Sequence, residues 1–510
     1  MKTRLTTEYL RKWIALYIAG VSMILVPVFI PKDGYLHLVG AKAHFYLLLA
    51  LPAAALAVFT EIFFFLTGRR KAEKRPGNSA RKYPVISLLL TAIALWSLLS
   101  TLFSFAVKAS LLGTGGWAMG SLMLVTLIFF TNYLFLYFRA SEKMFRAVMA
   151  VNAVLFLFAA IQMAGMDPFG LLAPLGKTFK RSYLSTIGQK NCFSGYLCLI
   201  LPLFWGRFAL VPVSGRKKPA LYAAFCALGF LAVLAADSDS TYAGIGVGAL
   251  AMLPFFLHSN VRTARAGQLL ILFAACLFLV RTAPVFSRKA AAAKDLSAAM
   301  LKLPSIAGVL ACGVFLIVFS RKWAAHKKLL LIILEAAVVL VIIAAVIYTM
   351  PRFNDSWGTN RGYIWRVGWE QFLQFSPKEK LIGIGPELLS FVYVELRMQL
   401  NRNVVSAHCE PLHVLLTQGI IGFVLYAGFW IYIVRLFVKD RMWERGEGVF
   451  FFPLAVYFGQ SLFCSVYPVT AVVFSVMTGM YLSHTSESGT KNIETSNQLF
   501  IQTQSGGGNG

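Results

Sequence analysis

The chain has 510 residues, of which 58% are apolar and only 14% are charged, and its apolar residues fall in blocks of about 20, the length of a membrane-spanning helix. Its net charge of +27 would suggest a nucleic-acid partner in a soluble chain, but the excess lies mostly in short loops between the apolar blocks. The composition therefore excludes a soluble globular protein, and we expect membrane lipids rather than nucleic acid as partners.

The apolar blocks predict an all-α polytopic membrane protein with about fourteen transmembrane helices. The predicted spans lie near residues 11–31, 43–67, 84–107, 117–138, 145–166, 191–213, 219–236, 241–258, 267–283, 301–320, 329–350, 413–436, 449–464 and 468–482. The last of these is the weakest prediction because it is short and follows its neighbour almost directly. We expect one membrane domain over residues 1–483 and a disordered, Ser/Thr/Gly-rich tail over residues 484–510.

The orientation is predicted from the basic loops. Every second loop carries an excess of Lys and Arg: 68–83, 139–146, 215–218, 262–265, 321–328 and 438–447. By the positive-inside rule these loops are cytoplasmic, which places both termini inside a multi-pass protein of the cytoplasmic membrane. The first span resembles a signal anchor without a convincing cleavage site, so we expect it to be retained.

Two longer loops lie on the predicted outer side. The first, residues 167–190, carries Arg181 and Lys190, and the second runs from residue 351 to residue 412. Positive charge kept outside favours an anionic partner, although single Lys and Arg side chains at a membrane interface often only reach toward lipid phosphate. We expect the 351–412 loop, which precedes the third-last helix, to carry the active site.

The first half of that loop, TNRGYIWRVGWEQFLQFSP (359–377), has a helical pattern with Asn360 as a plausible N-cap. Trp365, Trp369 and Phe372 recur at helical spacing and would suit the membrane surface. Arg361 falls in the first turn, where a cation opposes the helix dipole, so helix stability explains it poorly. A bound phosphate would reverse that penalty; the alternative is an interfacial helix without a ligand.

The second half of the loop contains KLIGIGPELLS (380–390), in which the glycines mark a turn and Pro386 suits the start of a helix that continues to about Arg402. The loop ends in SAHCEPLHVLLTQGIIG (406–422). Pro411 disfavours a helical residue before it, so the membrane helix should begin there and leave His408 at the outer interface. A histidine in that position can accept a proton from a hydroxyl near neutral pH. His413 would be a packed, hydrogen-bonded residue.

Four short segments together resemble the O-antigen ligase superfamily, which includes O-antigen ligases and the polymerases that join O-antigen or capsule repeat units. They are RGYIWR (361–366), GIGPELL (383–389), AHCEPLHVLLTQGIIG (407–422) and GQKNCFSGYLCLILPL (188–203). The number of spans and the single large outer loop also agree, and the architecture resembles that of type C membrane glycosyltransferases.

The resemblance implies an inverting, metal-independent glycan transfer on the outer face of the membrane, without a cofactor. The donor would be a glycan on undecaprenyl pyrophosphate, and the acceptor a glycan or lipid-linked glycan; whether the product is a polymer or a ligated glycan stays open. Carried onto this sequence, His408 is the catalytic base. The pyrophosphate-binding candidates are Arg361, Arg366, Arg397, Arg402, Lys190 and Arg181.

Two departures from the family pattern matter. Cys409 stands where the family usually has Asn, and AADSDSTYAGIGVG (235–248) lacks the arginine that the family usually has at the start of a middle span. The same segment holds Asp237 and Asp239, a spacing at which two carboxylates can share a divalent metal, although capping of the next helix also explains it. A disulfide among Cys192, Cys409 and Cys464 is a further alternative to free thiols.

A transporter, such as a flippase of lipid-linked oligosaccharides, is the main alternative from another class. Such proteins show related halves and ionisable groups deep in their spans. The sequence shows no internal repeat, and its few candidate buried charges are Glu61, Arg207, Arg281 and Glu335. Charge is concentrated in one outer loop instead, which favours chemistry at the membrane surface.

Overall fold

The structure is a computed structural model that describes residues 2–67, 84–113, 116–211, 217–293, 295–322, 326–400 and 404–485. The part of the tail beyond residue 485 lies outside these ranges. Almost every described element is a helix, and the one sheet among them is an antiparallel pair, β1 (Tyr183–Leu184) and β2 (Gly188–Gln189). The predicted all-α class is confirmed.

Within the described ranges, eleven helices are long and apolar enough to cross a membrane, and each overlaps a predicted span. They are α1 (Lys2–Gly20) with its continuation through η1 (Val21–Leu25) and α2 (Val26–Val28), α3 (Leu38–Leu66), α5 (Pro84–Leu102), α8 (Glu142–Met163), α10 (Lys190–Leu210), α11 (Lys217–Ala236), α12 (Asp239–Leu257), α13 (Asn260–Thr282), α16 (Leu303–Lys322), α17 (Lys327–Thr349) and α22 (Glu410–Lys439). The other three predicted spans correspond to the shorter α7 (Ser121–Tyr137) and α23 (Phe452–Ser461) and to a last helix at residues 468–485. The polytopic architecture is thereby confirmed.

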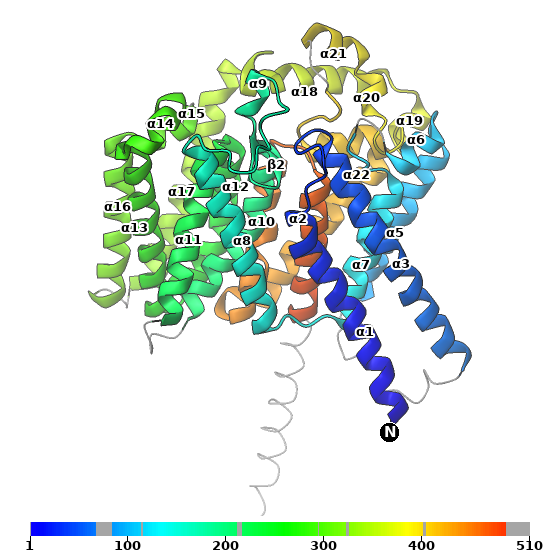
Figure 1. Cartoon of the computed structure of the whole chain (residues 1–510), viewed down its shortest axis with the longest axis horizontal. Helices are drawn as coiled ribbons and strands as arrows, with labels where there is room; N and C mark the ends of the chain where they lie inside the picture. Colours follow the sequence, from blue (N-terminus) through cyan, green and yellow to red (C-terminus); the bar gives the residue numbers. More distant parts are fainter. Residues whose placement is uncertain are drawn as a thin grey trace, which may run out of the picture.

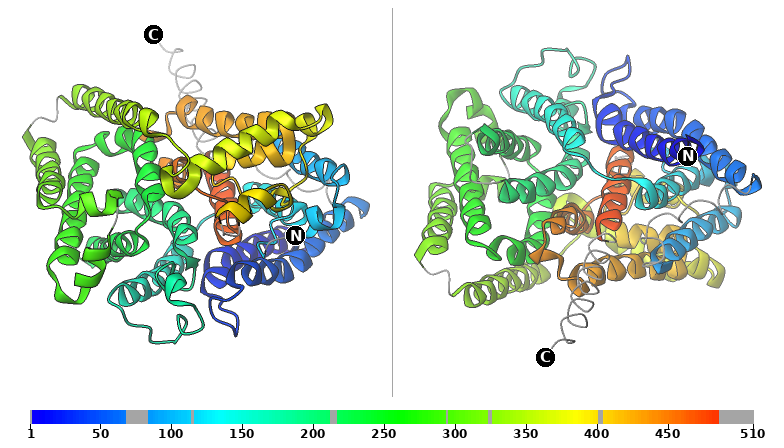
Figure 2. Two further views of the ribbon diagram at one scale, coloured as in Figure 1. Left: turned by 90° about the horizontal axis from the view of Figure 1, so that it is seen from above. Right: turned by 90° about the horizontal axis from the view of Figure 1, so that it is seen from below.

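The centre of the bundle is formed by α10, α12, α23 and the last helix, which is drawn in red at the middle of both views in Figure 2. Nearly all of α10 is buried. Small residues let α12 and α23 approach closely: a Cβ on Gly244 would lie 2.5 Å from the carbonyl oxygen of Val456, and one on Gly248 would lie 2.2 Å from the Val456 side chain. Such contacts between small residues are the usual basis of helix packing in membranes.

One end of the bundle is covered by the connecting segments. Figure 1 places the short elements α6, α9, α14, α15 and α18–α21 at the same, upper end. Their bounds are α6 (Val107–Leu112), α9 (Lys177–Lys180), η3 (Pro284–Phe286), α14 (Ser287–Ala292), α15 (Asp295–Met300), η5 (Met350–Arg352), α18 (Trp357–Gln374), α19 (Pro377–Ile382), α20 (Leu389–Val392) and α21 (Val394–Leu400). Two 3-10 turns, η6 (Met442–Glu444) and η7 (Gly446–Phe450), follow α22.

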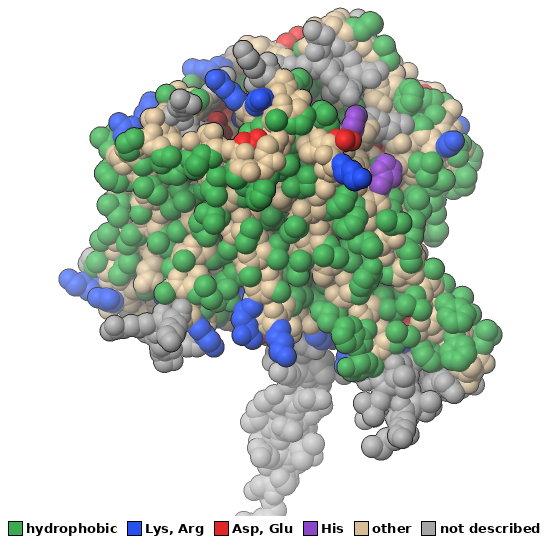
Figure 3. All heavy atoms as spheres, in the orientation of Figure 1, with side chains coloured by type: hydrophobic (Ala, Val, Ile, Leu, Met, Phe, Trp, Pro, Cys, Tyr) green, Lys and Arg blue, Asp and Glu red, His purple; other side chains and the backbone are tan. Residues whose placement is uncertain are grey.

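The surface has the distribution of a membrane protein. Figure 3 shows a broad belt of hydrophobic side chains, with Lys and Arg gathered above and below it. Three of the four charges noted as transporter candidates have structural partners: Glu61 pairs with Arg11 at 2.7 Å, Arg207 with Glu142, and Arg281 donates to the carbonyl oxygen of Leu301 at 2.9 Å. These three charged groups, which are partly buried or exposed, are therefore engaged by partners within the protein.

Candidate active site

His408 lies in the turn that precedes α22. The helix begins at Glu410 with Pro411 in its first turn, within one residue of the predicted start. The His408 backbone has φ 49°, a left-handed conformation that is uncommon outside glycine, and its N–H donates to Ser406 Oγ at 3.3 Å. Trp365 of α18 donates its indole N–H to the carbonyl oxygen of Ala407 at 3.0 Å. The loop and the membrane helix are therefore tied together beside the imidazole.

Two buried hydroxyls hold one side of the ring. Ser465 Oγ lies 3.2 Å from His408 Nδ1, and Ser465 and Ser406 are hydrogen-bonded to each other. Ser465 belongs to the turn between α23 and the last helix, far from His408 in sequence. Because Nδ1 is engaged, Nε2 is the ring nitrogen that remains to exchange a proton with a substrate.

The surroundings keep His408 neutral. Burial first, and then the positive charge of Arg361 and the neighbouring His413, together lower its pKa from 6.5 to about 4. The imidazole is therefore a free base at neutral pH. A neutral imidazole with a free nitrogen can accept a proton from a hydroxyl.

Arg361 follows a strained turn in α18. Gly358, Thr359 and Asn360 all have positive φ, between 59° and 70°, so Asn360 does not adopt the extended conformation predicted for an N-cap. A left-handed conformation costs about 1–2 kcal/mol for each residue with a side chain. Beyond this turn, Arg361 donates from Nε to the carbonyl oxygen of Phe463 at 2.8 Å and from a terminal nitrogen to that of Gly358 at 2.7 Å.

The starts of α10 and α12 complete the cluster. Lys190 donates from Nζ to the carbonyl oxygen of Asp237 at 3.5 Å, and Ser238 Oγ donates to Asn191 Oδ1 at 3.2 Å. The thiol of Cys464 lies 3.9 Å from the carbonyl oxygen of Asn191. Phe463, which contacts Arg361, and Ser465, which contacts His408, are the two chain neighbours of Cys464. The structure therefore places Lys190, Arg361 and His408 close together.

The remaining predicted cations are placed differently. Arg366 is half-exposed and pairs with Asp355 at 2.7 Å and with Glu370 at 3.0 Å, and these bonds hold the pKa of Asp355 below its usual range. Arg181 is exposed at the end of α9. Arg397 lies in α21 but its side chain is outside the description, and Arg402 lies outside the described residues.

The Asp237 and Asp239 pair has structural roles. Asp237 ends α11 with φ 50°, and its N–H donates to the carbonyl oxygen of Val233. Asp239 opens α12 and accepts the N–H of Leu296 at 3.3 Å. The described residues contain no group of three or more His, Cys, Asp or Glu side chains suited to a metal ion. All seven cysteines are free, so the alternative of a disulfide is not realised.

The glycines of GIGPELL support a break in α22. Gly419 has φ 69° and ψ −172°, which interrupts the helix and frees the carbonyl groups of the turn before it. Ile384 and Gly385 donate their N–H groups to the carbonyl oxygens of Leu416 and Thr417. A Cβ on Gly383 would lie 2.3 Å from Thr417, and one on Gly419 would lie 2.3 Å from Leu381. Trp96 and Ser100 of α5 bond the carbonyl oxygens of Gln418 and Thr417.

Two other predictions for this region were wrong. The aromatic stripe of α18 does not face a membrane surface, because Trp365 packs against Trp357 and Phe463, and Phe372 is buried; only Trp369 is half exposed. The helix predicted from Pro386 to about Arg402 is two short helices, α20 and α21, with Tyr393 between them. Tyr393 is fully buried in the small core beneath the loop, which explains why the chain turns there.

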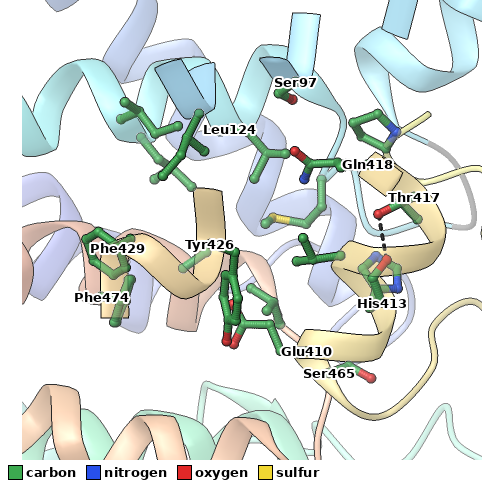
Figure 4. A pocket seen from close by; sticks show the side chains of 18 of the residues that line it. Ser97, Leu124, Glu410, His413, Thr417, Gln418, Tyr426, Phe429, Ser465 and Phe474 are labelled. Carbon is green, nitrogen blue, oxygen red and sulfur yellow. Dashed lines mark hydrogen bonds between the residues drawn. The ribbon is translucent and has the colours of Figure 1, made fainter. Parts of the chain in front are cut away.

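A cavity of about 210 Å³ opens beside His408 and extends along α22 between α5, α7 and the last helix. Figure 4 shows Glu410, His413, Thr417 and Tyr426 on α22, with Ser97 on the opposite wall. His413 lines this cavity and its Nδ1 has no hydrogen-bond partner among the described residues, so the predicted hydrogen bonding is not met at this nitrogen.

Sequence reasoning missed Ser465, Ser406 and Glu410. Ser465 carried no local signal, since it stands in a short link between two predicted spans. Glu410 was visible as a carboxylate at the mouth of a membrane helix, and an ionisable group inside a span indicates function by default.

One comparison with known protein families finds a match that includes the candidate site. Residues 296–427, which include α18 to the middle of α22 and hence both Arg361 and His408, match a family model described as O-antigen ligase. No curated protein shows a significant match to the chain.

Proposed function

We propose that the chain acts as a member of the O-antigen ligase superfamily and transfers a glycan from undecaprenyl pyrophosphate to a sugar hydroxyl of an acceptor at the outer face of the cytoplasmic membrane; the family match over residues 296–427 supports this. The observation that carries this proposal is the neutral imidazole of His408, held by Ser465 beside Arg361 and at the mouth of a cavity. Polymerisation and ligation use the same step and differ only in the acceptor.

The proposed reaction assigns one role to each group. His408 Nε2 accepts the proton of the acceptor hydroxyl while its oxygen attacks the anomeric carbon of the donor. The bond from that carbon to the pyrophosphate oxygen breaks on the opposite side, which inverts the configuration, and the electron pair leaves with undecaprenyl pyrophosphate. His408 then releases its proton to solvent. Arginine and lysine can stabilise the leaving pyrophosphate without a metal ion.

The donor pyrophosphate is proposed to bind on the side of Arg361 and Lys190. The hydrogen bonds of Arg361 among the described residues go to backbone carbonyl oxygens; it forms no ion pair with a carboxylate, although Asp239 is near enough to feel its charge. Arg366 is tied to two carboxylates, and we assign it a secondary role together with Arg181, Arg397 and Arg402. The sidedness follows from the basic loops, which the positive-inside rule assigns to the cytoplasm.

The decisive test replaces His408 with Ala in the purified full-length protein. Loss of a general base costs about 10²- to 10⁴-fold in turnover, so glycan transfer from a lipid-linked donor should nearly vanish while donor binding is retained. His258→Ala is a matched control, because His258 is exposed beyond the far end of α12. Turnover like that of the wild type in His408→Ala would remove the proposal. If the protein moved the lipid donor across the bilayer of proteoliposomes without transferring its glycan, the protein would be a transporter and not a transferase.

A further inference from the structure

The cavity beside His408 is lined by polar groups that the protein leaves unsatisfied. Glu410 Oε2, His413 Nδ1, the Tyr426 hydroxyl and the Trp430 indole N–H all belong to lining residues, are buried, and make no well-formed hydrogen bond among the described residues. Ser461 lies near Glu410 and Tyr426, and Tyr426 lies near Trp430, without completing such a bond. Ser97 Oγ on α5 and Thr478 Oγ1 on the last helix share this state. An unpaired buried polar atom costs about 1–3 kcal/mol, so a ligand that pairs with several of them would be bound favourably.

The charge of the cavity indicates which substrate it suits. Its described lining residues include Glu387 and Glu410 but no Lys or Arg, and Arg361 is not among them. A pyrophosphate needs cations, and a carboxylate-bearing sugar would meet two acidic side chains at the wall. The cavity therefore disfavours an anionic ligand such as a pyrophosphate or an acidic sugar, whereas Arg361 and Lys190 lie outside its lining.

The shape and the other walls favour a ring with both polar and apolar faces. One water needs about 10–15 Å³ of such space, so a cavity of about 210 Å³ holds a ligand of many atoms. Tyr426, Phe429, Trp430 and Phe474 supply aromatic surface, and Figure 4 shows Glu410 and Tyr426 side by side. Carboxylate, imidazole and hydroxyl groups together both donate and accept, as the hydroxyls of a sugar require.

We propose that this cavity is the subsite for a neutral sugar ring of the acceptor, bound through Glu410 and Tyr426. His408 then stands between two regions of different chemistry: the acceptor ring occupies the cavity, whose described lining has no Lys or Arg, and the donor pyrophosphate lies by Arg361. The identity of the ligand as the acceptor rests on the proposed glycan transfer. The binding of a neutral sugar in the cavity does not, and it can be measured without turnover.

The test uses the full-length protein in lipid nanodiscs and saturation-transfer NMR. The probes are the methyl glycosides of neutral hexoses and N-acetylhexosamines, with methyl glucuronide as the charged comparison. At least one neutral probe should bind saturably, and the glucuronide should bind more weakly. Tyr426→Phe and Glu410→Leu each remove hydrogen-bonding groups with little change in volume, and each should weaken binding about 3- to 10-fold. Tyr242→Phe is the matched control, because Tyr242 has a buried unpaired hydroxyl outside the cavity.

The outcomes separate this proposal from the proposed function. Failure of every neutral probe to bind, or binding that Tyr426→Phe and Glu410→Leu leave unchanged while thermal unfolding shows them folded, would overturn the subsite even if transfer is observed. Absence of transfer with intact, variant-sensitive sugar binding would instead overturn the transferase function and leave the sugar site standing. Where transfer is observed, both variants should raise the KM for the acceptor and leave the KM for the lipid donor unchanged.

Discussion

Replacement of Arg361 with Gln tests both the donor site and the electrostatics of His408. Arg361 commits two N–H groups to the carbonyl oxygens of Phe463 and Gly358, and its charge remains available for a phosphate. One charge-assisted hydrogen bond to phosphate is worth roughly 1.5–3 kcal/mol, which corresponds to about 10- to 150-fold in affinity. Arg361→Gln should weaken binding of the lipid-linked donor by that factor.

The same substitution should change the pH dependence of transfer. The charge of Arg361 is one of the causes, after burial, that lower the pKa of His408 to about 4. Since only the neutral imidazole accepts a proton, kcat/KM should stay constant as pH falls toward 5 and decline as it approaches 4. Without the guanidinium the pKa of His408 rises, so the decline should begin at a higher pH in Arg361→Gln.

The assay measures donor affinity and the pH profile of transfer with the same purified protein. Arg366→Gln serves as the control, because Arg366 is half-exposed and its charge is paired with Asp355 and Glu370. It should change donor affinity much less than Arg361→Gln and leave the pH profile in place. If Arg361→Gln changed neither the donor affinity nor the pH at which kcat/KM declines, Arg361 would not bind the donor. Its role would then be only to stabilise the turn at residues 358–360.

Three further outcomes are expected. Ser465→Ala should lower kcat with little change in the KM for donor or acceptor, as expected for a residue that positions His408. Ser465→Thr keeps the hydroxyl and should retain most of the wild-type kcat. Equal effects of both variants would speak against this role. Gly383→Ala should destabilise the protein by about 1–3 kcal/mol because its Cβ would lie 2.3 Å from Thr417, whereas Gly246→Ala, where nothing lies within 4 Å, should be neutral or stabilising in thermal unfolding. Transfer should survive exhaustive EDTA treatment and the double substitution Asp237→Asn with Asp239→Asn; rescue of an EDTA-treated enzyme by Mg²⁺ would instead show a metal requirement.

The membrane helices were predictable because their signal is local. Each span is a run of apolar residues of sufficient length, and the start of α22 followed from the restriction that Pro411 imposes on its neighbour. The position of His408 at the mouth of that helix could therefore be predicted from the sequence. The roles of the glycines could be predicted only in part: Gly383 and Gly385 indicated a turn, but not that this turn pairs with the broken helix at Gly419.

The partners of the predicted residues could not be found in the same way. Ser465 contacts His408 and Phe463 contacts Arg361 across 57 and 102 residues, and no periodicity or motif encodes such contacts. The aromatic residues of α18 failed for a related reason. A stripe of Trp and Phe at helical spacing fits a membrane surface and a buried core equally well. In the structure Trp365 packs against Phe463, in a turn that is distant in sequence.

The position of Lys190 can explain why the start of α12 lacks an arginine. The electrostatic stabilisation of a pyrophosphate depends on where positive charge lies and not on which helix supplies it. Lys190 opens α10 and its ammonium group reaches the carbonyl oxygen of Asp237, at the mouth where the family usually has its arginine. Asp239, in turn, uses its carboxylate to accept the N–H of Leu296. We therefore infer that Lys190 supplies the missing cation at this mouth, and the EDTA experiment tests whether a metal is also required there.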